Sequence, residues 1–363
     1  MALLFLDGWD HYTPSDSAVA SVKWTLTGGG GGGSWTTAAG RIAGNCFVLT
    51  RGSSAGNGTV QAYHPLTQTP STLIWGVAYK FANISVFTDI TSVDDNVTGT
   101  NQVTIRMSTG GSIRVLRNGT QIGSDSAPCL FLNTWQYIET KVVVASGTSG
   151  SVGVWVDGVQ VQNITGVNTQ GSTGTNANKI YVGDRSGNQG AGIAQQYDDC
   201  YICDTTSGLG NSGTPLGNCR IVTTFPSGNS ADNPGHDQWS QTGGTGGNFW
   251  TAVNDNPEDG DTSYLSSGTS GQIASFTHAS LPATVTSIKA LQFNLISRVD
   301  DASTHTLAAF QRNSTTDSVS GNTPNLVGSY LDELIVAENS LQTASAWTTS
   351  EFTASEFGWK LTT

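Results

Sequence analysis

Along most of the chain, apolar and polar residues alternate over short segments separated by turn-forming residues, a pattern typical of half-buried β-strands. Two neighbouring pairs of such segments are joined by the dipeptides Asn118-Gly119 and Asp157-Gly158. These dipeptides favour type I′ turns, because both central residues of that turn need a positive φ. We therefore expect β-hairpins over residues 113–122 and 152–161.

Between the two hairpins lies a long predicted strand, residues 135–144. Alternation along it places Tyr137, Glu139, Lys141 and Val143 on one face. Further strands, the first of them an edge strand, are predicted at residues 1–6, 179–183, 197–204, 219–225, 291–295 and 306–312. So many short strands predict a fold built from sheets.

The C-terminal region contains a helix start signal. Thr348 and Glu351 have the spacing of a capping box, in which the hydroxyl and the carboxylate both satisfy backbone amides of the first turn. Phe352 and Phe357 supply apolar side chains, and Gly358 is placed to end the helix. We expect one short helix in this region.

The composition favours an all-β fold with two domains. The 363 residues include 45 Gly and only 12% charged residues, and a chain rich in Gly, Ser, Thr and Asn disfavours helices. Ten Trp, nine Tyr and twelve Phe argue against disorder, because disordered segments contain few aromatic residues. A Gly-, Ser- and Thr-rich stretch indicates a linker. We predict jelly-roll-like β-sandwiches at 1–207 and 218–363, joined by a linker at 208–217.

The charge narrows the possible partners. The formal net charge of −12 would repel nucleic-acid phosphates and anionic lipids, so neither nucleic acid nor a membrane is expected as a partner. The sequence contains no run of about 18 apolar residues that could span a bilayer. Residues 1–7 lack the basic segment of a secretory signal. We therefore expect synthesis in the cytoplasm without a signal peptide.

Neither the cysteines nor the acidic loops predict a firm metal site. Cys200 and Cys203 have the spacing of a metal or redox pair, but they lie in a strand-like run without a suitable second pair, which favours buried thiols. Asp255, Asp259 and Asp261 offer oxygen ligands for calcium. Pro257 occupies the middle of that loop, so a solvated turn is favoured over an ion site. We expect no cofactor, with calcium as the one candidate.

Catalytic signals are weak. Glycosidases need two carboxylates that flank the sugar bond, and no predicted strand here carries such a pair on one face. Glu139 stands among apolar residues, where a bond to Lys141 or to a turn amide explains it better than catalysis. The five histidines are scattered without a catalytic motif. We therefore expect a protein that is not an enzyme.

Sugar binding needs aromatic rings beside glycine-rich or polar loops. Trp24 and Trp35 flank the glycine run 28–33, and Trp250 lies in a second glycine-rich region. These three residues are the candidate glycan contacts, although most tryptophans of a β-sandwich belong to its core.

Several segments resemble known families. Residues 135–139, the run Val154-Trp-Val-Asp-Gly158 and the segment 197–204 together resemble a concanavalin A-like or laminin G-like jelly roll. Over nearly the whole chain, the order of motifs resembles that of tailed-bacteriophage virion proteins; these motifs lie at residues 3–12, 198–204, 216–222, 250–264 and 345–358. The second resemblance implies a structural protein on the outside of a phage particle.

Two classes of function follow. The first is a virion protein, exposed as a capsid decoration, head fibre or tail-associated protein, with capsid or tail proteins as partners and a homo-oligomeric state. The alternative is a glycan-binding adhesin that contacts the host surface, assisted by calcium if the acidic loop binds it. A polysaccharide depolymerase is the least favoured of the three hypotheses.

Overall fold

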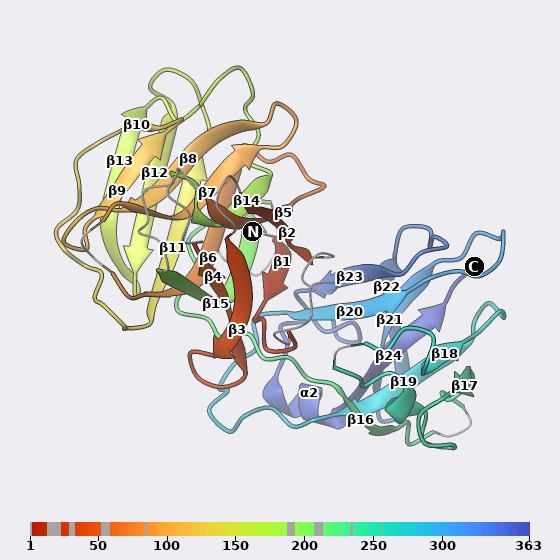
Figure 1. Ribbon diagram of the computed structural model, residues 1–363. Helices are drawn as coiled ribbons and strands as arrows, with labels where there is room; N and C mark the ends of the chain where they lie inside the picture. The colour runs from red at the N-terminus through yellow and green to blue at the C-terminus, as the bar shows by residue number, and fades with distance from the viewer. Residues whose placement is uncertain are drawn as a thin grey trace. The chain divides into compact units, whose positions relative to one another are not determined.

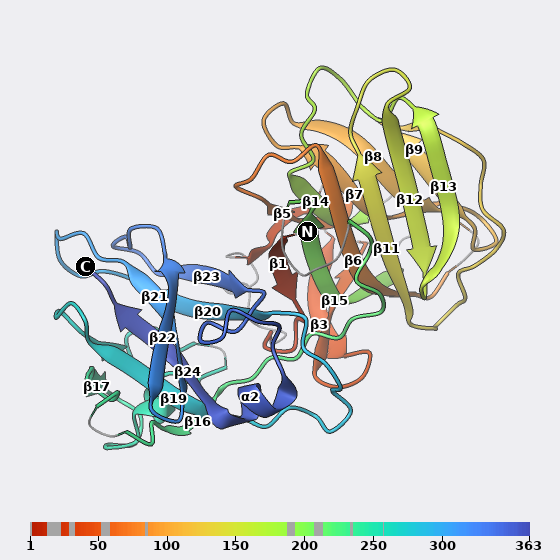
Figure 2. The ribbon, with the colours of Figure 1, turned by 180° about the vertical axis from the view of Figure 1, so that it is seen from behind.

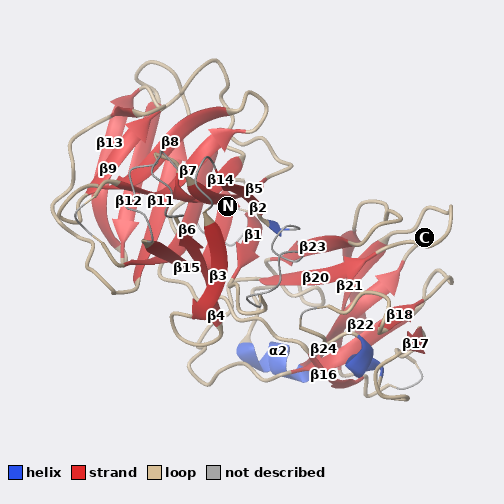
Figure 3. Ribbon diagram, in the orientation of Figure 1, coloured by secondary structure: helices blue, strands red, loops and turns tan. Residues whose placement is uncertain are grey.

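The computed structural model describes residues 2–12, 23–28, 33–51, 59–83, 86–186, 193–206, 213–232, 235–256 and 258–363. The chain divides into two compact units, Met1–Ile221 and Val222–Thr363. Strands dominate both units, as Figure 3 shows, and the prediction of an all-β fold with one short C-terminal helix is confirmed. Within the described ranges, no helix is long and apolar enough to cross a membrane.

The first unit is a sandwich of two antiparallel sheets (Figures 1 and 2). The eight-stranded sheet has the order β13-β12-β11-β6-β15-β4-β3, and β1 pairs with β15. Its strands are β1 (Leu3–Asp7), β3 (Ser34–Ala39), β4 (Asn45–Thr50), β6 (Thr72–Phe81), β11 (Gln136–Val143), β12 (Gly150–Val156), β13 (Val159–Val167) and β15 (Ala194–Asp204).

The seven-stranded sheet has the order β10-β9-β8-β7-β14-β5-β2. Its strands are β2 (Thr25–Gly28), β5 (Val60–Pro65), β7 (Thr88–Asp95), β8 (Thr100–Met107), β9 (Ile113–Arg117), β10 (Thr120–Gln121) and β14 (Lys179–Asp184). Side chains of the inner faces join the two sheets: Trp75 Nε1 donates to Thr91 Oγ1 at 3.0 Å, and the Tyr197 hydroxyl donates to the Ile90 carbonyl at 2.9 Å. The fully buried ring of Trp75 therefore marks the core side of β6.

The second unit is built on a five-stranded antiparallel sheet of order β16-β19-β24-β21-β22. Two-stranded ribbons, β17–β18 and β20–β23, accompany it, and Phe293 of β20 packs edge-on against Phe357 and Trp359 of β24. The elements are β16 (Pro226–Asn229), β17 (Ser240–Thr242), η1 (Phe249–Ala252), β18 (Tyr264–Ser266), β19 (Ile273–His278), β20 (Leu291–Ser297), β21 (Leu307–Asn313), β22 (Thr316–Asn322), β23 (Leu331–Ala337), α2 (Thr349–Ala354) and β24 (Ser355–Leu361).

Both predicted hairpins are present, since β9 pairs with β10 and β12 pairs with β13. Their turn residues have the positive φ values that a type I′ turn needs: 43° and 82° at Asn118 and Gly119, and 48° and 80° at Asp157 and Gly158. Local turn chemistry was therefore sufficient to place these hairpins. Part of the predicted glycine loop, residues 29–32, and part of the predicted linker, residues 208–212, lie outside the described residues.

The predicted strand at 219–225 is wrong, because the first strand of the second unit begins at Pro226. Backbone groups of this segment that would pair with a neighbouring strand form hydrogen bonds with side chains instead. The amide of Ile221 donates to Asp199 at 2.6 Å, and the carbonyl of Cys219 accepts from Arg41 at 2.5 Å. These bonds hold residues 219–221 as irregular backbone within the first unit.

The C-terminal helix begins as predicted and ends differently. Thr348 caps it by accepting a hydrogen bond from the amide of Glu351, but the Glu351 carboxylate bonds instead to side chains outside the helix. The helix ends at Ala354, and Gly358 lies inside β24. A Cβ at Gly358 would collide with the carbonyl oxygen of Ala274, so this glycine permits close strand approach rather than ending a helix.

Candidate functional site

A row of polar and aromatic side chains crosses the outer face of the eight-stranded sheet, the face that points away from Trp75 and the core. Glu139 of β11 lies opposite Gly76 of β6 on one side and Trp155 of β12 on the other. Tyr201 of β15 lies opposite Gly76 on its far side. The row therefore runs from Tyr201 over Gly76 to Glu139 and Trp155, and the predicted face of β11 is part of it.

Two glycines make room for the aromatic rings of this row. A Cβ at Gly76 would collide with the rings of Tyr201 and Tyr137, and a Cβ at Gly153 would collide with the indole of Trp155. The indole therefore lies over the backbone of β12 at Gly153, whose cross-strand neighbour is Lys141. Trp155 and Lys141 are both half-buried, so part of each side chain is open to solvent.

The Tyr201 end of the row is covered by residues 213–221. Tyr201 donates its hydroxyl hydrogen to Glu139 Oε1 at 2.5 Å, and the amide of Gly217 donates to the same oxygen at 2.8 Å. The amide of Leu216 donates to the Tyr201 hydroxyl at 3.0 Å. Burial raises the pKa of Glu139, and it raises the pKa of Tyr201 well above its ordinary value. A turn amide does bond to Glu139, as the sequence predicted.

A second set of charged groups fixes the end of this segment. The Arg41 guanidinium lies over the Tyr137 ring at 5.1 Å and pairs with Asp199 at 2.8 Å. The backbone amide of Arg41 donates to Asp198 at 2.7 Å. Burial, together with the neighbouring charge of Asp199, raises the pKa of Asp198 to about 8. These groups are engaged with the protein itself, which leaves the Trp155 end as the open part of the face.

The open part combines three kinds of group that recognise sugars. The Trp155 indole supplies an apolar ring, Lys141 supplies a cation, and the amide of Gln160 lies within 3.3 Å of the Cβ position of Gly153. Lys141 Nζ donates one hydrogen bond to the carbonyl of Gly213 at 2.6 Å. An ammonium group has three donors, so two of them are left for a ligand. We call Trp155, Lys141 and Gln160 the Trp155 platform.

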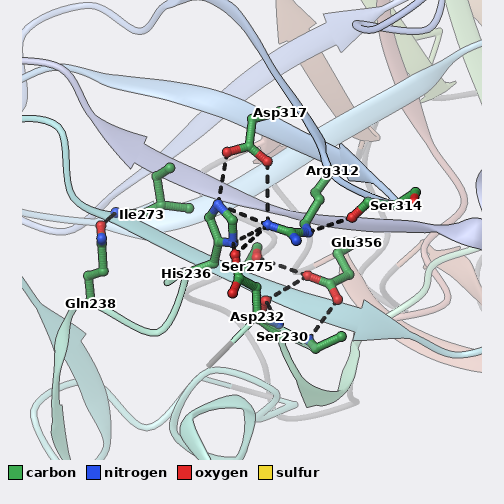
Figure 4. A network of polar contacts seen from close by, with 11 residues as sticks. Ser230, Asp232, His236, Gln238, Ile273, Ser275, Arg312, Ser314, Asp317 and Glu356 are labelled. Carbon is green, nitrogen blue, oxygen red and sulfur yellow. Dashed lines mark hydrogen bonds and ion pairs between the residues drawn. The ribbon is translucent and has the colours of Figure 1, made fainter. Parts of the chain in front are cut away.

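The second unit contains a polar network on the β24–β21–β22 part of its sheet (Figure 4). Arg312 Nη1 lies 2.7 Å from His236 Nδ1 and 2.7 Å from Asp232 Oδ2, and His236 Nε2 lies 2.9 Å from Asp317 Oδ2. His236 Nδ1 also lies 3.2 Å from Asp232 Oδ2, so the ring is surrounded by Arg312 and two aspartates. Both ring nitrogens therefore face groups of the protein itself, and the network connects Asp232 and His236 to strands β21 and β22.

The same view shows Glu356 of β24 as an acceptor for three donors. Its carboxylate accepts from the Ser230 hydroxyl at 2.7 Å, from the Ala231 amide at 2.7 Å and from the Ser275 hydroxyl at 3.3 Å. Glu356 is only 8% exposed. These bonds attach Ser230 and Ala231 to β24. The sequence did not predict them, because the partners of Glu356 lie 81 to 126 residues away.

The three tryptophans predicted to contact glycans occupy different environments. Trp24 is 1% exposed; it stacks on Trp9 and donates its indole hydrogen to Asp7 at 2.8 Å, so its ring is a core element that no sugar can reach. Trp35 is half-buried with its ring 5.8 Å from that of Phe47. Trp250 lies half-buried in η1. Trp24 and Trp35 belong to the first unit and Trp250 to the second.

The three aspartates of the calcium candidate also diverge. Asp255 and Asp259 both accept from the hydroxyl of Ser263, at 2.8 Å and 3.0 Å. Asp261 instead pairs with Arg298 at 2.9 Å and accepts from the hydroxyl of Tyr330 at 2.6 Å. Among the residues that the structure describes, no group of three or more His, Cys, Asp or Glu side chains could hold a metal ion. The calcium expectation therefore has no assembled ligand set.

The cysteines are placed as the sequence predicted for buried thiols. Cys200 and Cys203 are both fully buried in β15, and burial raises the pKa of Cys200 well above its ordinary value. None of the five cysteines, all of which lie in the described ranges, forms a disulfide.

Comparisons with known proteins give similarity of fold only. No protein-family profile matches the chain, and no curated protein sequence matches it. Among solved structures, the chain is similar to an endo-β-1,4-glucuronan lyase from Trichoderma reesei, with 12% identity, a TM-score of 0.44, and coverage of 56% of this chain and 96% of that one.

Two further similar structures come from other sources. An alginate lyase from Aplysia kurodai has 11% identity, a TM-score of 0.42 and coverage of 56% of this chain and 100% of that one. A carbohydrate esterase of bacteriophage phi24B has 12% identity, a TM-score of 0.37 and coverage of 55% and 97%. At these values no residue role or activity is transferred to this chain.

The expectation that the protein is not an enzyme is corrected by these comparisons. Alginate and glucuronan lyases are among the similar structures, so β-sandwiches of this kind include enzymes. The sequence search had looked for paired carboxylates on one strand. That criterion does not detect a site assembled from single residues of several strands.

Proposed function

We propose that the first unit binds an acidic polysaccharide on the outer face of its eight-stranded sheet, with Trp155 as the stacking residue. The observation that supports this most is the position of the half-buried indole over Gly153, whose cross-strand neighbour is Lys141. A flat aromatic ring favours contact with the apolar face of a sugar ring, because both surfaces are apolar and rigid. The platform is assembled on paired strands, which hold its geometry.

Lys141 directs the proposal toward carboxylate-bearing sugars. The chain has 15 Lys and Arg against 27 Asp and Glu, so an acidic polymer needs a local basic group to bind, and Lys141 supplies one beside Trp155. When the ring of a uronate sugar stacks on Trp155, its carboxylate would accept charge-assisted hydrogen bonds from the remaining donors of Lys141. The amide of Gln160 would supply a neutral donor and acceptor for hydroxyl groups.

The test compares binding of the full chain to an acidic polymer, alginate, and a neutral polymer, dextran, by affinity electrophoresis and calorimetry. Trp155→Ala should remove binding to alginate. Tyr63→Ala is the matched control, because Tyr63 is a half-buried ring beneath a lysine, Lys179, on the seven-stranded sheet. Equal binding by wild type and Trp155→Ala would overturn the proposal. Size-exclusion chromatography of the same mixtures detects any shortening of the polymer and so reveals cleavage.

The location of the protein is a separate matter. A place on the outside of a tailed-phage particle, with capsid or tail partners and a homo-oligomeric state, stays a prediction from the order of motifs in the sequence. Mass spectrometry of purified particles tests it, and absence of the protein from the particle would contradict it. Polysaccharide binding does not depend on this location.

A further inference from the structure

Ser340, Gln311 and Glu351 meet in the interior of the second unit. Ser340 follows β23 and is 2% exposed, Gln311 lies on β21 and is 0% exposed, and Glu351 lies in the first turn of α2. The Ser340 hydroxyl donates to Glu351 Oε1 and lies 3.3 Å from Gln311 Oε1. A buried hydroxyl group therefore lies between a half-buried carboxylate and a buried side-chain carboxamide.

The carboxamide of Gln311 has a defined orientation. Its Oε1 accepts from the backbone amide of Gln342 at 3.2 Å. Its Nε2 donates to Glu351 Oε1 at 3.2 Å and to the hydroxyl of Ser355 at 3.1 Å. Glu351 Oε1 thus accepts hydrogen bonds from both the Ser340 hydroxyl and Gln311 Nε2.

Ser340 is also oriented by backbone groups. Its oxygen accepts from the amides of Gln342 and Thr343, each at 3.1 Å. A hydroxyl has one donor and two acceptor positions, so these two bonds direct its hydrogen toward Glu351. A capping box would have aimed the Glu351 carboxylate at the amide of Thr348, but here the carboxylate serves Ser340 and Gln311.

These groups match the parts of an acyl-transfer site. Such a site needs a nucleophile, a base within hydrogen-bond distance of it, a carbonyl group, a donor for the developing oxyanion, and an acid for the leaving group. Ser340 is the nucleophile, Glu351 is both base and acid, and the amide of Gln342 is the oxyanion donor. The carbonyl group is the carboxamide of Gln311.

We propose that Ser340 and Gln311 join in an intramolecular ester. Ser340 Oγ forms a bond to Gln311 Cδ, and the bond between Cδ and Nε2 breaks. Glu351 removes the hydroxyl proton and passes it to the departing nitrogen, which leaves as ammonia. The reaction needs no oxidant, reductant or other co-reactant, because an alcohol and an amide give an ester and ammonia.

The fold holds the two reacting groups next to each other, which does not happen between free molecules in solution. Both reacting groups are held in place by backbone donors, and such positioning replaces an encounter between free molecules. Ser340 and Gln311 are themselves buried, which limits the access of water to the ester that joins them. The ester would connect β21 to the segment after β23 across 29 positions of the chain, a covalent constraint in a protein whose cysteines, all within the described ranges, form no disulfide.

Intact-mass spectrometry of the purified full chain tests this directly. The ester lowers the mass by about 17 Da relative to the sequence, through loss of ammonia. Ser340→Ala should restore the sequence mass expected for that variant, and Ser340→Thr should retain the loss because it keeps a hydroxyl. Ser345→Ala, an exposed position of the same loop, is the matched control and should also retain the loss.

Peptide mapping locates the bond. Trypsin cleaves after Arg298, Arg312 and Lys360, so the ester should join the peptides 299–312 and 313–360 into one species. Two separate peptides and a wild-type protein of unchanged mass would overturn the proposal. A gain of about 1 Da at Gln311 would also overturn it, since it reports conversion to glutamate without a lasting bond. The wild-type measurement decides even if a variant fails to fold.

Discussion

Tyr201 donates a hydrogen bond of 2.5 Å to Glu139 across a strand that lies between them. Tyr201 belongs to β15 and Glu139 to β11, and β6 separates these two strands in the sheet. The bond is possible because the residue of β6 in register with both is Gly76. Because Gly76 has no side chain, a hydrogen bond can connect two strands that are not neighbours in the sheet.

Gly76→Ala should lower the free energy of unfolding of the first unit by about 1–3 kcal/mol. The added Cβ would collide with the rings of Tyr201 and Tyr137, which are themselves buried and cannot move far. Urea denaturation measures the change. Gly268→Ala is the control, since its Cβ would meet nothing within 4 Å. Equal losses in the two variants would show that the alanine acts through the backbone alone.

Tyr201→Phe should destabilise the first unit by roughly 1–3 kcal/mol, because it leaves buried polar groups without a partner. The Glu139 carboxylate loses one donor, and the amide of Leu216 loses its acceptor. Thermal denaturation followed by circular dichroism measures the shift. Tyr63→Phe, on the half-buried ring of the other sheet, should change little. A Tyr201→Phe protein as stable as wild type would contradict a structural role for this bond.

Asp198 should make the stability fall as the pH rises. Burial and the charge of Asp199 raise the pKa of its carboxyl from 3.8 to about 8. Between these values the folded protein holds a proton that the unfolded chain has released. The stabilisation is therefore complete below the unfolded pKa and is lost as the pH rises through the folded pKa.

Asp198→Asn should flatten this dependence between about pH 5 and about pH 8. Asparagine keeps an acceptor oxygen for the amide of Arg41 but cannot ionise. The measurement is urea denaturation of both proteins across that range. The difference between them reports the titration of Asp198 together with its effect on the neighbouring Asp199, whose pKa is also raised. A difference that does not vary with pH would contradict the raised pKa.

Glu356→Gln should destabilise the second unit by about 1–3 kcal/mol. The carboxylate accepts from three donors, and the substitution replaces one acceptor oxygen by an NH₂ group that would face the hydroxyl of Ser230 or the amide of Ala231. Differential scanning calorimetry follows the transition. Asp300→Asn, at an exposed acid, is the control for loss of a negative charge. Equal transition temperatures in both variants would show that these hydrogen bonds contribute nothing.

Local signals predicted the parts of the fold that local chemistry determines. The turns at Asn118-Gly119 and Asp157-Gly158, the alternation along β11 and the cap at Thr348 all depend on residues within a few positions of one another. Gly358 was wrongly assigned to a helix end, because its role depends on Ala274 in a neighbouring strand. Sequence spacing carries no information about such a partner.

The candidate site was predicted only in part for the same reason. Glu139 and Tyr201 are 62 residues apart, and their meeting depends on strand order and on Gly76. Trp24 lies beside a glycine run, which suggested exposure, but its indole hydrogen goes to the buried Asp7. Trp155 was overlooked because it stands inside a hairpin motif. The glycine two positions before it, on the same face of β12, was the available signal for a ring that lies over the sheet.

Lys141→Gln should weaken binding of the acidic polymer about five- to tenfold and leave binding of a neutral polymer unchanged. The substitution removes the charge next to Trp155 but keeps a polar side chain with a hydrogen-bond donor. Because the lost interaction is ionic, added salt should reduce wild-type affinity for alginate more than that of the variant. Calorimetric titrations at low and high salt measure both effects. If the variant binds alginate like wild type while Trp155→Ala does not, the platform recognises sugar rings without regard to their charge, and the assignment to acidic polysaccharides is wrong.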